Sequence, residues 1–365
     1  MPKVTVLMSV YNGELYLREA IESILAQTYR DFELLIVNDG STDSSREIIL
    51  SFNDPRIRLL DNECNLGLTR SLNKGWKLAQ GEFIARQDAD DISEPERLAK
   101  QVICLEKNPD VVLVGTWHRE MDAQGNLLGE WELPRTWTQI RWSLLYFTPF
   151  VHSSVMLRQS AIVKQIGFYN EDLSYSQDYE LWFRIASLMP VVSLDERLVR
   201  TRINPNSMTA TYGEKALEGF RMRSATVGHL LAREKNNPGD NEQRLNRMTE
   251  LLFNFSYNSN IDSVNFTLEE VNEIIEEILN LQVAFCQNYN LAPIECLNHR
   301  KEVLNNISDR LMDLARRHLE KDNYLGWQLL VMVSRLNKPV LFTKKYIRLA
   351  STLIISRLVD KIVKN

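Results

Sequence analysis

The chain carries the sequence Gly81-Glu82-Phe83-Ile84-Ala85-Arg86-Gln87-Asp88-Ala89-Asp90-Asp91, in which an apolar run ends in three carboxylates within four residues. Carboxylates this close together raise one another's pKa and cost stability unless a cation or a hydrogen-bond donor neutralises them. A divalent metal carrying a phosphorylated ligand would do so, because hard oxygen ligands suit Mg²⁺ and Mn²⁺. The segment also fits an acidic turn in which Asp91 or Ser93 caps the helix that begins near Glu94. The segment alone leaves both interpretations open.

The first 120 residues around this segment alternate strand and helix patterns. Residues at helical spacing separate five apolar runs, which are predicted as strands at 4–10, 32–37, 57–60, 83–85 and 111–116. Repeating β-α-β units imply an α/β fold with a mostly parallel, twisted sheet and helices on both faces. Ligands of such sheets bind beyond the carboxyl ends of the strands, where the loops at Tyr11, Asp39 and Asp88 are expected to converge.

The remainder of the chain divides into two regions. Residues 117–212 give no clear periodicity, contain five tryptophans and several turn signals, and are expected to be irregular. From about residue 214 the pattern changes to helices rich in Leu, Ile, Glu, Lys and Asn. The sequence therefore predicts an α/β domain over 1–213 and a helical C-terminal domain over 214–365.

Composition narrows the class of protein. The 365 residues are 44% apolar and 25% charged, which is ordinary for a globular protein, and the net charge of −5 argues against general binding to nucleic acid. The four cysteines are far apart and lack metal-binding spacing, as expected in a reducing cytoplasm. The N-terminus resembles a strand more than a signal peptide, and no stretch approaches the roughly 18–20 apolar residues of a membrane span. A cytoplasmic protein is expected.

The loop after the first strand excludes two common nucleotide sites. Residues 11–14 contain one glycine, Gly13, so the glycine fingerprint of a dinucleotide-binding domain is missing, and no Walker-type phosphate loop is present. A nucleotide would therefore be held by side chains and a metal. Tyr11 is suited to stacking on a base, and Asp39 to accepting a hydrogen bond from an imide N–H such as that of uracil. Asp39 also fits an ordinary turn residue between Asn38 and Gly40.

Four separate motifs resemble those of family-2 glycosyltransferases with the GT-A fold. They are residues 9–12, residues 37–43, residues 65–67 and residues 81–91, and they occur in that family's order and spacing. The resemblance covers roughly residues 3–205, and the 214–365 region lies outside it.

The resemblance implies a donor site. Tyr11 and Asp39 would hold the uracil of a UDP-sugar, and Asp88 would contact the ribose or the metal. Asp90 would bind the Mg²⁺ or Mn²⁺ ion that bridges the donor diphosphate, so that one cation neutralises both the carboxylates and the leaving group. Asp91 either joins this set or only caps the next helix.

The resemblance also implies a catalytic base. Inverting glycosyl transfer needs a carboxylate that deprotonates the acceptor hydroxyl as it attacks. Asp178, at the start of an apolar helix, matches the family's acidic acceptor motif, with Gln177 where an acidic residue is often found. The alternative is a carboxylate that merely interacts favourably with the helix macrodipole.

Four further residues are candidates for the diphosphate or the acceptor. Residues 151–158 resemble the subgroup of the family that builds bacterial surface polysaccharides, and His152 would then touch the diphosphate, the metal or the acceptor. Arg70 and Arg86 are candidates for pairing with phosphate, and Trp182 for stacking under an acceptor sugar. Each has a structural alternative, namely a structural histidine, solvated arginines and a core tryptophan.

The C-terminal residues 338–365 carry seven basic side chains against one acid, with apolar residues at helical spacing. A basic amphipathic helix of this kind suits an anionic membrane surface. The alternative is a last helix that packs on its own domain with its charges in solvent.

These observations predict an inverting, metal-dependent enzyme that moves a hexose from a UDP-sugar to a glycan acceptor. The acceptor is expected to be a polyprenyl-diphosphate-linked repeat unit of a surface polysaccharide, with the enzyme peripheral on the inner face of the cell membrane. One rival is a sugar nucleotidyltransferase, which needs a glycine-rich basic loop that residues 9–14 lack. The other rival is a catalytically silent sugar-nucleotide-binding protein. The presence of all four aspartates that the activity needs argues against it; they are Asp39, Asp88, Asp90 and Asp178.

Overall fold

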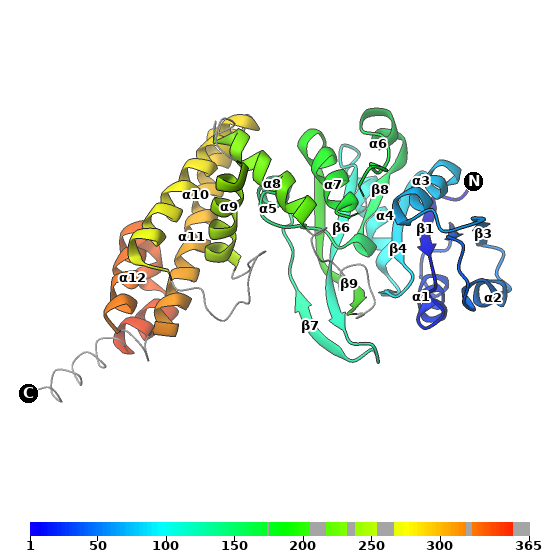
Figure 1. Ribbon diagram of the computed structural model, residues 1–365, viewed down its shortest axis with the longest axis horizontal. Helices are drawn as coiled ribbons and strands as arrows, with labels where there is room; N and C mark the ends of the chain where they lie inside the picture. Colours follow the sequence, from blue (N-terminus) through cyan, green and yellow to red (C-terminus); the bar gives the residue numbers. More distant parts are fainter. Residues whose placement is uncertain (174, 204–216, 232–237, 254–265, 319–322, 353–365) are drawn as a thin grey trace, which may run out of the picture. The chain divides into compact units, whose positions relative to one another are not determined.

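The computed structural model describes residues 1–173, 175–203, 217–231, 238–253, 266–318 and 323–352 (Figure 1). The chain forms two compact units, Met1–Gly219 and Phe220–Asn365. The domain boundary predicted near residue 213 falls within 204–216, outside the described residues.

The first unit is built on one mixed sheet. Its strands follow the order β3-β2-β1-β4-β8-β6-β9-β5, with β7 paired to β6. The pairs among β1, β2, β3 and β4 are parallel, whereas β8 runs antiparallel to β4 and β6. The strand bounds are β1 Val4–Val10, β2 Phe32–Asn38, β3 Ile57–Asp61, β4 Phe83–Asp88, β5 Ile92–Ser93, β6 Leu113–Met121, β7 Leu127–Trp131, β8 Met156–Arg158 and β9 Val191–Arg202.

Seven α-helices and one 3₁₀ helix accompany these strands among the described residues of the first unit. They are α1 Leu17–Leu25, α2 Ser45–Leu50, α3 Leu68–Leu78, α4 Arg97–Lys107, α5 Trp137–Ser143, the 3₁₀ helix His152–Ser154, α6 Gln159–Gln165 and α7 Gln177–Leu188.

Helices cover both faces of the parallel strands, and β1 and β2 are buried throughout. One core cluster joins alternate residues of β1 to apolar residues of α1, α2 and α4. The opposite face of β1 meets α3, where a Cβ atom on Gly75 would lie 2.4 Å from Leu7 Cδ1. This close approach explains a glycine inside a helix. The predicted α/β fold with helices on both faces is thereby confirmed.

The described residues of the region 117–212, which are 117–173 and 175–203, are not irregular, so that expectation was wrong for them. They contain much of β6, all of β7, β8 and β9, and helices α5, α6 and α7. The strand signal of β9 was missed because charged residues interrupt its apolar pattern. These charges pair across the sheet instead: Arg197 contacts Glu130 and Glu132, and Arg200 contacts Glu94.

The second unit is helical in its described residues, as the sequence predicted. Its elements are α8 Leu217–Leu230, α9 Pro238–Phe253, α10 Leu268–Asn288, α11 Pro293–His318, α12 Asn323–Leu336 and a 3₁₀ helix Lys338–Phe342, followed by helical residues 344–352. A capping box between Thr267 and Glu270 satisfies backbone donors at the start of α10. None of the helices in the described residues is long and apolar enough to cross a membrane.

Candidate functional site

The sheet register places the three polar loops at one edge. Ser9 of β1 pairs with Asp88 of β4, and Val10 of β1 pairs with Asn38 of β2. Because these strands are parallel, the residues that follow them leave the sheet on the same side. Tyr11, Asp39 and the segment 88–91, called here the acidic loop, therefore share the carboxyl end of the sheet.

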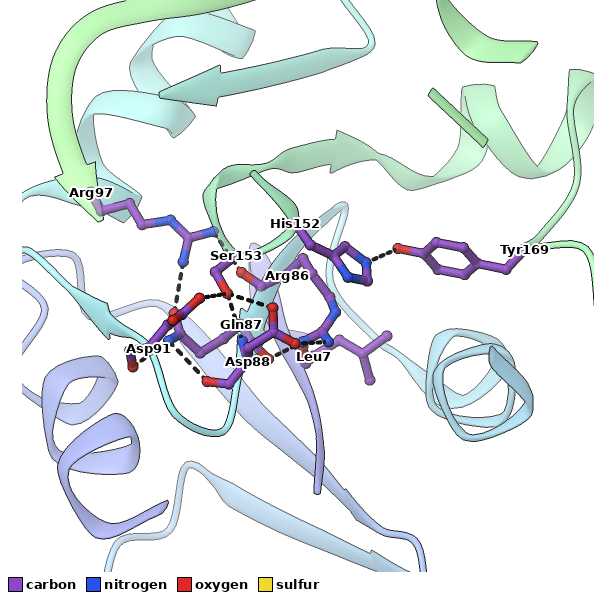
Figure 2. A network of polar contacts seen from close by, with 9 residues as sticks. All are labelled: Leu7, Arg86, Gln87, Asp88, Asp91, Arg97, His152, Ser153 and Tyr169. Atoms are coloured by element: carbon purple, nitrogen blue, oxygen red, sulfur yellow. Dashed lines mark hydrogen bonds and ion pairs between the residues drawn. The ribbon is translucent and has the colours of Figure 1, made fainter. Parts of the chain in front are cut away.

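Beside the acidic loop, the Ser153 hydroxyl lies between the carboxyl groups of Asp88 and Asp91 (Figure 2). Ser153 Oγ is 2.8 Å from Asp88 Oδ2 and 2.5 Å from Asp91 Oδ2, and it accepts a hydrogen bond from the backbone N–H of Asp88 at 3.0 Å. A hydroxyl has a single proton, so it can donate to only one of the two carboxyl groups. The other contact requires a proton on a carboxyl oxygen.

The electrostatic environments of the two carboxyl groups favour different protonation states. Burial, and then the charges of Asp88 and Asp90, raise the pKa of Asp91 well above its usual value. Burial also acts on Asp88, but the Arg86 guanidinium and further donors hold the pKa of Asp88 below its usual value. The environment of Asp91 therefore favours its protonated form more than that of Asp88 does, and the other oxygen of Asp91 accepts a hydrogen bond from the backbone N–H of Arg202 at 2.9 Å.

Helix α4 is not capped by Asp91 or Ser93, which corrects that expectation. The helix begins at Arg97 after Glu96, and no side chain caps it. Ser93 Oγ instead donates to Gln87 Oε1 at 2.7 Å and accepts from Arg97 Nη1 at 2.8 Å. Ser93 is thus hydrogen-bonded to buried residues next to the acidic loop, and Asp91 is one of the residues of that loop.

Two buried arginines supply positive charge beneath the acidic loop. The Arg86 side chain is only 1% exposed, and its guanidinium pairs with Asp88 and with the backbone carbonyls of Leu7 and Gln87. Burial lowers the pKa of Arg97 to about 9, which leaves it a cation at neutral pH. Arg86 therefore neutralises Asp88 within the protein, which corrects the expectation that it faces phosphate or solvent.

The donor set of the acidic loop can be tested against a divalent metal. Across the described part of the chain, no three His, Cys, Asp or Glu side chains converge to hold a metal ion. Both oxygens of Asp88 already contact Arg86 or Ser153. Asp90 is half-buried at the tip of the loop. Mg²⁺ commonly takes one or two carboxylates together with substrate phosphates, so Asp90 fits a cation that arrives with a diphosphate.

The loop that carries Tyr11 is fastened to the loop after β2. Tyr11 is 50% exposed, and the residue after it, Asn12, has a positive φ of 50°. The backbone N–H of Asn12 donates to Ser41 Oγ at 3.0 Å, and Asn12 Oδ1 accepts from the backbone N–H of Thr42 at 2.8 Å. These two hydrogen bonds fix the backbone directly after Tyr11, whose phenol ring is exposed.

Asp39 organises the neighbouring loop at residues 62–67. Its Oδ1 accepts from Asn62 Nδ2 and from the backbone N–H of Leu66, both at 2.8 Å, and its Oδ2 accepts from Gly67 N–H at 3.0 Å. The side chain is almost fully buried. A carboxylate offers about four acceptor positions, so these three bonds leave one for a ligand. Asp39 is thus more than a turn residue, because it fixes the 65–67 motif.

The start of α7 carries the candidate base, Asp178. Asp178 lies in the first turn of this helix, after Ser176 with a positive φ of 54°. Burial raises the pKa of Tyr169, with Asp178 and Asp88 both adding to that rise. The charges of Asp178 and of Asp88 in the acidic loop therefore both act on Tyr169.

His152 lies beside Tyr169 (Figure 2). His152 Nε2 is 2.8 Å from Tyr169 Oη, and burial, reinforced by the Arg86 charge, lowers the pKa of His152 to about 3. The imidazole is therefore neutral at physiological pH. A neutral ring cannot pair with phosphate as a cation, although it remains a hydrogen-bonding group.

The two remaining candidates are placed differently from each other. Trp182 is fully buried, with its ring edge-on to Phe150, His152 and Tyr169. A fully buried ring has no face to offer a sugar, which corrects the expected stacking role. The Arg70 side chain is 61% exposed, with its Nε 3.8 Å from Glu171 Oε2. Arg70 remains available to a ligand near α3.

Ser153, Tyr169 and Arg202 were not singled out from the sequence. Ser153 lies within the motif 151–158, which offered a signal, but its partners are 62 and 65 residues away. Tyr169 and Arg202 lie outside every motif that carried the resemblance.

Known proteins resemble this chain in sequence. The sequence model of the family described as Glycosyl transferase family 2 matches residues 5–167. A protein of Haemophilus influenzae, described as an uncharacterized glycosyltransferase, is 31% identical over 227 residues, which are 60% of this chain and 70% of that protein. An uncharacterized glycosyltransferase of Methanocaldococcus jannaschii is 40% identical over 212 residues, 56% of this chain and 72% of that protein. The chain belongs to glycosyltransferase family 2.

The fold of this chain is also similar to that of a solved structure. Residues 1–349 of TarS from S. aureus, crystallised in complex with UDP-GlcNAc, superpose with a TM-score of 0.55 at 18% identity. The match covers 87% of this chain and 92% of the TarS chain. At this identity the likeness concerns the fold alone, and it agrees with the GT-A fold expected from the sequence.

Proposed function

We propose that this family-2 glycosyltransferase transfers a hexose from a UDP-sugar to a hydroxyl of a glycan acceptor, with inversion at the anomeric carbon. The main support for this proposal is that Tyr11, Asp39 and the acidic loop follow three neighbouring parallel strands, β1, β2 and β4, at the same edge of the sheet. Asp178 is linked electrostatically to the same place through Tyr169. The TarS complex with UDP-GlcNAc supports a uridine nucleotide as the donor.

Each proposed role uses a feature of its residue. The exposed ring of Tyr11 stacks on uracil, and the remaining acceptor position of Asp39 receives the imide N–H. Asp90, with Asp88 beside it, would hold an Mg²⁺ or Mn²⁺ ion together with the diphosphate. When bound, such a cation neutralises charge on the leaving diphosphate. Arg70 is a candidate for contacting the donor phosphates from α3.

In the chemical step, the acceptor oxygen attacks the anomeric carbon while the bond from that carbon to the UDP oxygen breaks. The proton of the acceptor hydroxyl passes to the Asp178 carboxylate, and UDP leaves with the bond electrons. His152 and Tyr169 are joined by a hydrogen bond, and the charges of both Asp178 and Asp88 act on the Tyr169 phenol.

Donor binding is testable at Tyr11. Replacing Tyr11 with Ala should raise the KM for the UDP-sugar by roughly 5- to 150-fold, since stacking of a base on an aromatic ring contributes about 1–3 kcal/mol. The turnover number should change little because the ring lies away from the reacting carbon. Metal-dependent UDP release across a panel of sugar nucleotides gives the wild-type reference. Tyr324→Ala, an exposed tyrosine of the second unit, is the matched control.

The same assay separates the rivals. A silent binding protein would release no UDP from any sugar nucleotide, with or without acceptor. A nucleotidyltransferase would instead release pyrophosphate from UTP and a sugar phosphate. A Tyr11→Ala variant with wild-type KM would remove the base-stacking role.

The acceptor is proposed to be a lipid-linked glycan, with the basic C-terminal segment on an anionic membrane. In the described part of this segment, Phe342 is 85% and Ile347 53% exposed, and Lys344 and Arg348 are exposed cations. Lys345 behaves differently, because it pairs with Asp309 and Asp313 of α11. The beginning of the segment therefore packs on its own unit while presenting other side chains outward. Residues 353–365 lie outside the described residues.

Replacing Lys344 and Arg348 with Ser should weaken binding to vesicles that contain anionic phosphatidylserine by about 30-fold at low salt. Each basic residue near such a surface contributes about 1 kcal/mol, and salt screens this attraction. Co-sedimentation with vesicles measures the effect. The control, Lys301→Ser with Arg316→Ser on α11, removes the same charge elsewhere. Equal losses in both double variants would show that net charge, and not this segment, governs binding.

A further inference from the structure

We infer that Arg202 is a positioning residue that fixes the backbone of the acidic loop in the geometry that binds a cation together with a diphosphate. Arg202 is the last residue of β9, and its side chain is only 2% exposed. The inference deepens the proposed function and rests on it, because it assigns a support for Asp90.

The guanidinium of Arg202 joins the acidic loop to the β6–β7 turn. Its Nε donates to the backbone carbonyl of Asp90 at 3.1 Å. Its Nη1 donates to the carbonyls of Asp122 and Ala123, both at 3.1 Å. The backbone N–H of Arg202 also holds Asp91 Oδ1 at 2.9 Å. One residue thus grips two consecutive positions of the acidic loop.

The same side chain reaches α1, which follows the loop that carries Tyr11. Arg202 Nη2 lies 2.5 Å from Glu19 Oε2, and the guanidinium lies 4.4 Å from the centre of the Tyr16 ring. Arg202 therefore connects the uracil side of the proposed donor site to the diphosphate side. Both sides must be spaced correctly for one nucleotide to reach them.

Arg202 is suited to positioning and not to direct contact with phosphate. All three nitrogens of its guanidinium already donate to protein oxygens, and the side chain is buried. Its positive charge is paired with Glu19, and its contact with Asp90 is through the backbone carbonyl. Hydrogen bonds that orient a metal-binding residue from behind commonly change metal affinity or activity by about 10- to 100-fold when removed.

The test compares Arg202→Met with Arg202→Lys and with Arg200→Met. Arg200 lies two residues earlier on the same strand, and its side chain pairs with Glu94 Oε1 at 3.1 Å, outside the acidic loop. Mn²⁺ binding in the presence of UDP is measured by electron paramagnetic resonance, and UDP binding with and without Mn²⁺ by calorimetry. Thermal unfolding shows which variants are folded.

Arg202→Met should weaken Mn²⁺ binding in the presence of UDP by about 10- to 100-fold. Arg202→Lys should recover part of this loss, because it restores the charge but cannot bridge Asp90, the β6–β7 turn and Glu19 at once. Arg200→Met should bind Mn²⁺ and UDP as the wild type does. If Arg202→Met does not fold, the comparison of Arg202→Lys with the wild type carries the test.

Folded Arg202 variants with wild-type affinity for Mn²⁺ and UDP would overturn this inference and leave the proposed function standing. A wild-type protein that binds UDP with the same affinity with and without Mn²⁺ would overturn the proposed metal site and the inference together. A loss of UDP affinity that is equal with and without Mn²⁺ would also overturn it, because the acidic loop would then not be the part that Arg202 positions.

Discussion

Asp90→Asn is expected to lower metal-dependent sugar transfer by on the order of 10³-fold, because a cation at a leaving diphosphate contributes several kcal/mol to the transition state. Asparagine keeps the shape of the side chain but loses the charge that pairs with the cation. The fold should persist, since Gln87 Nε2, Ser153 and Arg202 hold the acidic loop through other atoms. UDP affinity in the presence of Mn²⁺ should fall, and UDP affinity without metal should not.

Transfer rates with increasing Mn²⁺ concentration measure this effect, with removal of metal by EDTA as the chemical counterpart. Asp110→Asn, an exposed aspartate before β6, is the matched control. The metal assignment would be wrong if the wild type kept its full rate in excess EDTA. It would also be wrong if Asp90→Asn responded to Mn²⁺ as the wild type does, because the cation would then be held elsewhere.

Much of the fold could be predicted because parallel strands buried on both faces are continuous apolar runs. Residues 4–10 and 32–37 are such runs, and both became fully buried strands, β1 and β2. The charged strand β9 could not be recognised in this way. Its arginines find partners on β5 and β7 or in the loops beside them, at positions that only the folded sheet brings together.

The loops of the candidate site could be predicted from the order of strands, but the partners of their side chains could not. Arg86 and Asp88 lie two residues apart on one strand and face the same side, so their pairing was available from periodicity. The contacts of Ser153 and Arg202 with the acidic loop span 62 to 112 residues. Such contacts depend on the sheet order β4-β8-β6-β9, which the local pattern did not reveal.

Burial decided the roles that composition left open. From the sequence, Trp182 and Arg86 were both candidates for contacting a ligand. The structure buries both and gives each an internal function, packing for Trp182 and charge neutralisation for Arg86. Tyr11 and Arg70, which stay exposed, remain suited to a ligand.

Asp178→Asn is expected to lower the rate of transfer by on the order of 10²- to 10⁴-fold while donor binding is retained, the usual contribution of a general base. Single-turnover transfer to a glycan acceptor measures the rate, and calorimetry with UDP and Mn²⁺ measures donor binding. Asp172→Asn, in the exposed loop before α7, is the matched control.

A purely structural Asp178 predicts a different pair of results. A carboxylate in the first turn of a helix contributes about 0.3–1 kcal/mol to stability through the macrodipole, so its loss would lower the unfolding temperature slightly and leave the rate nearly unchanged. A large loss of rate with an unchanged unfolding temperature therefore identifies the base. The anomeric configuration of the product gives an independent check, because direct attack with Asp178 as the base inverts it. A product with the donor's configuration would contradict this mechanism even if Asp178→Asn were inactive.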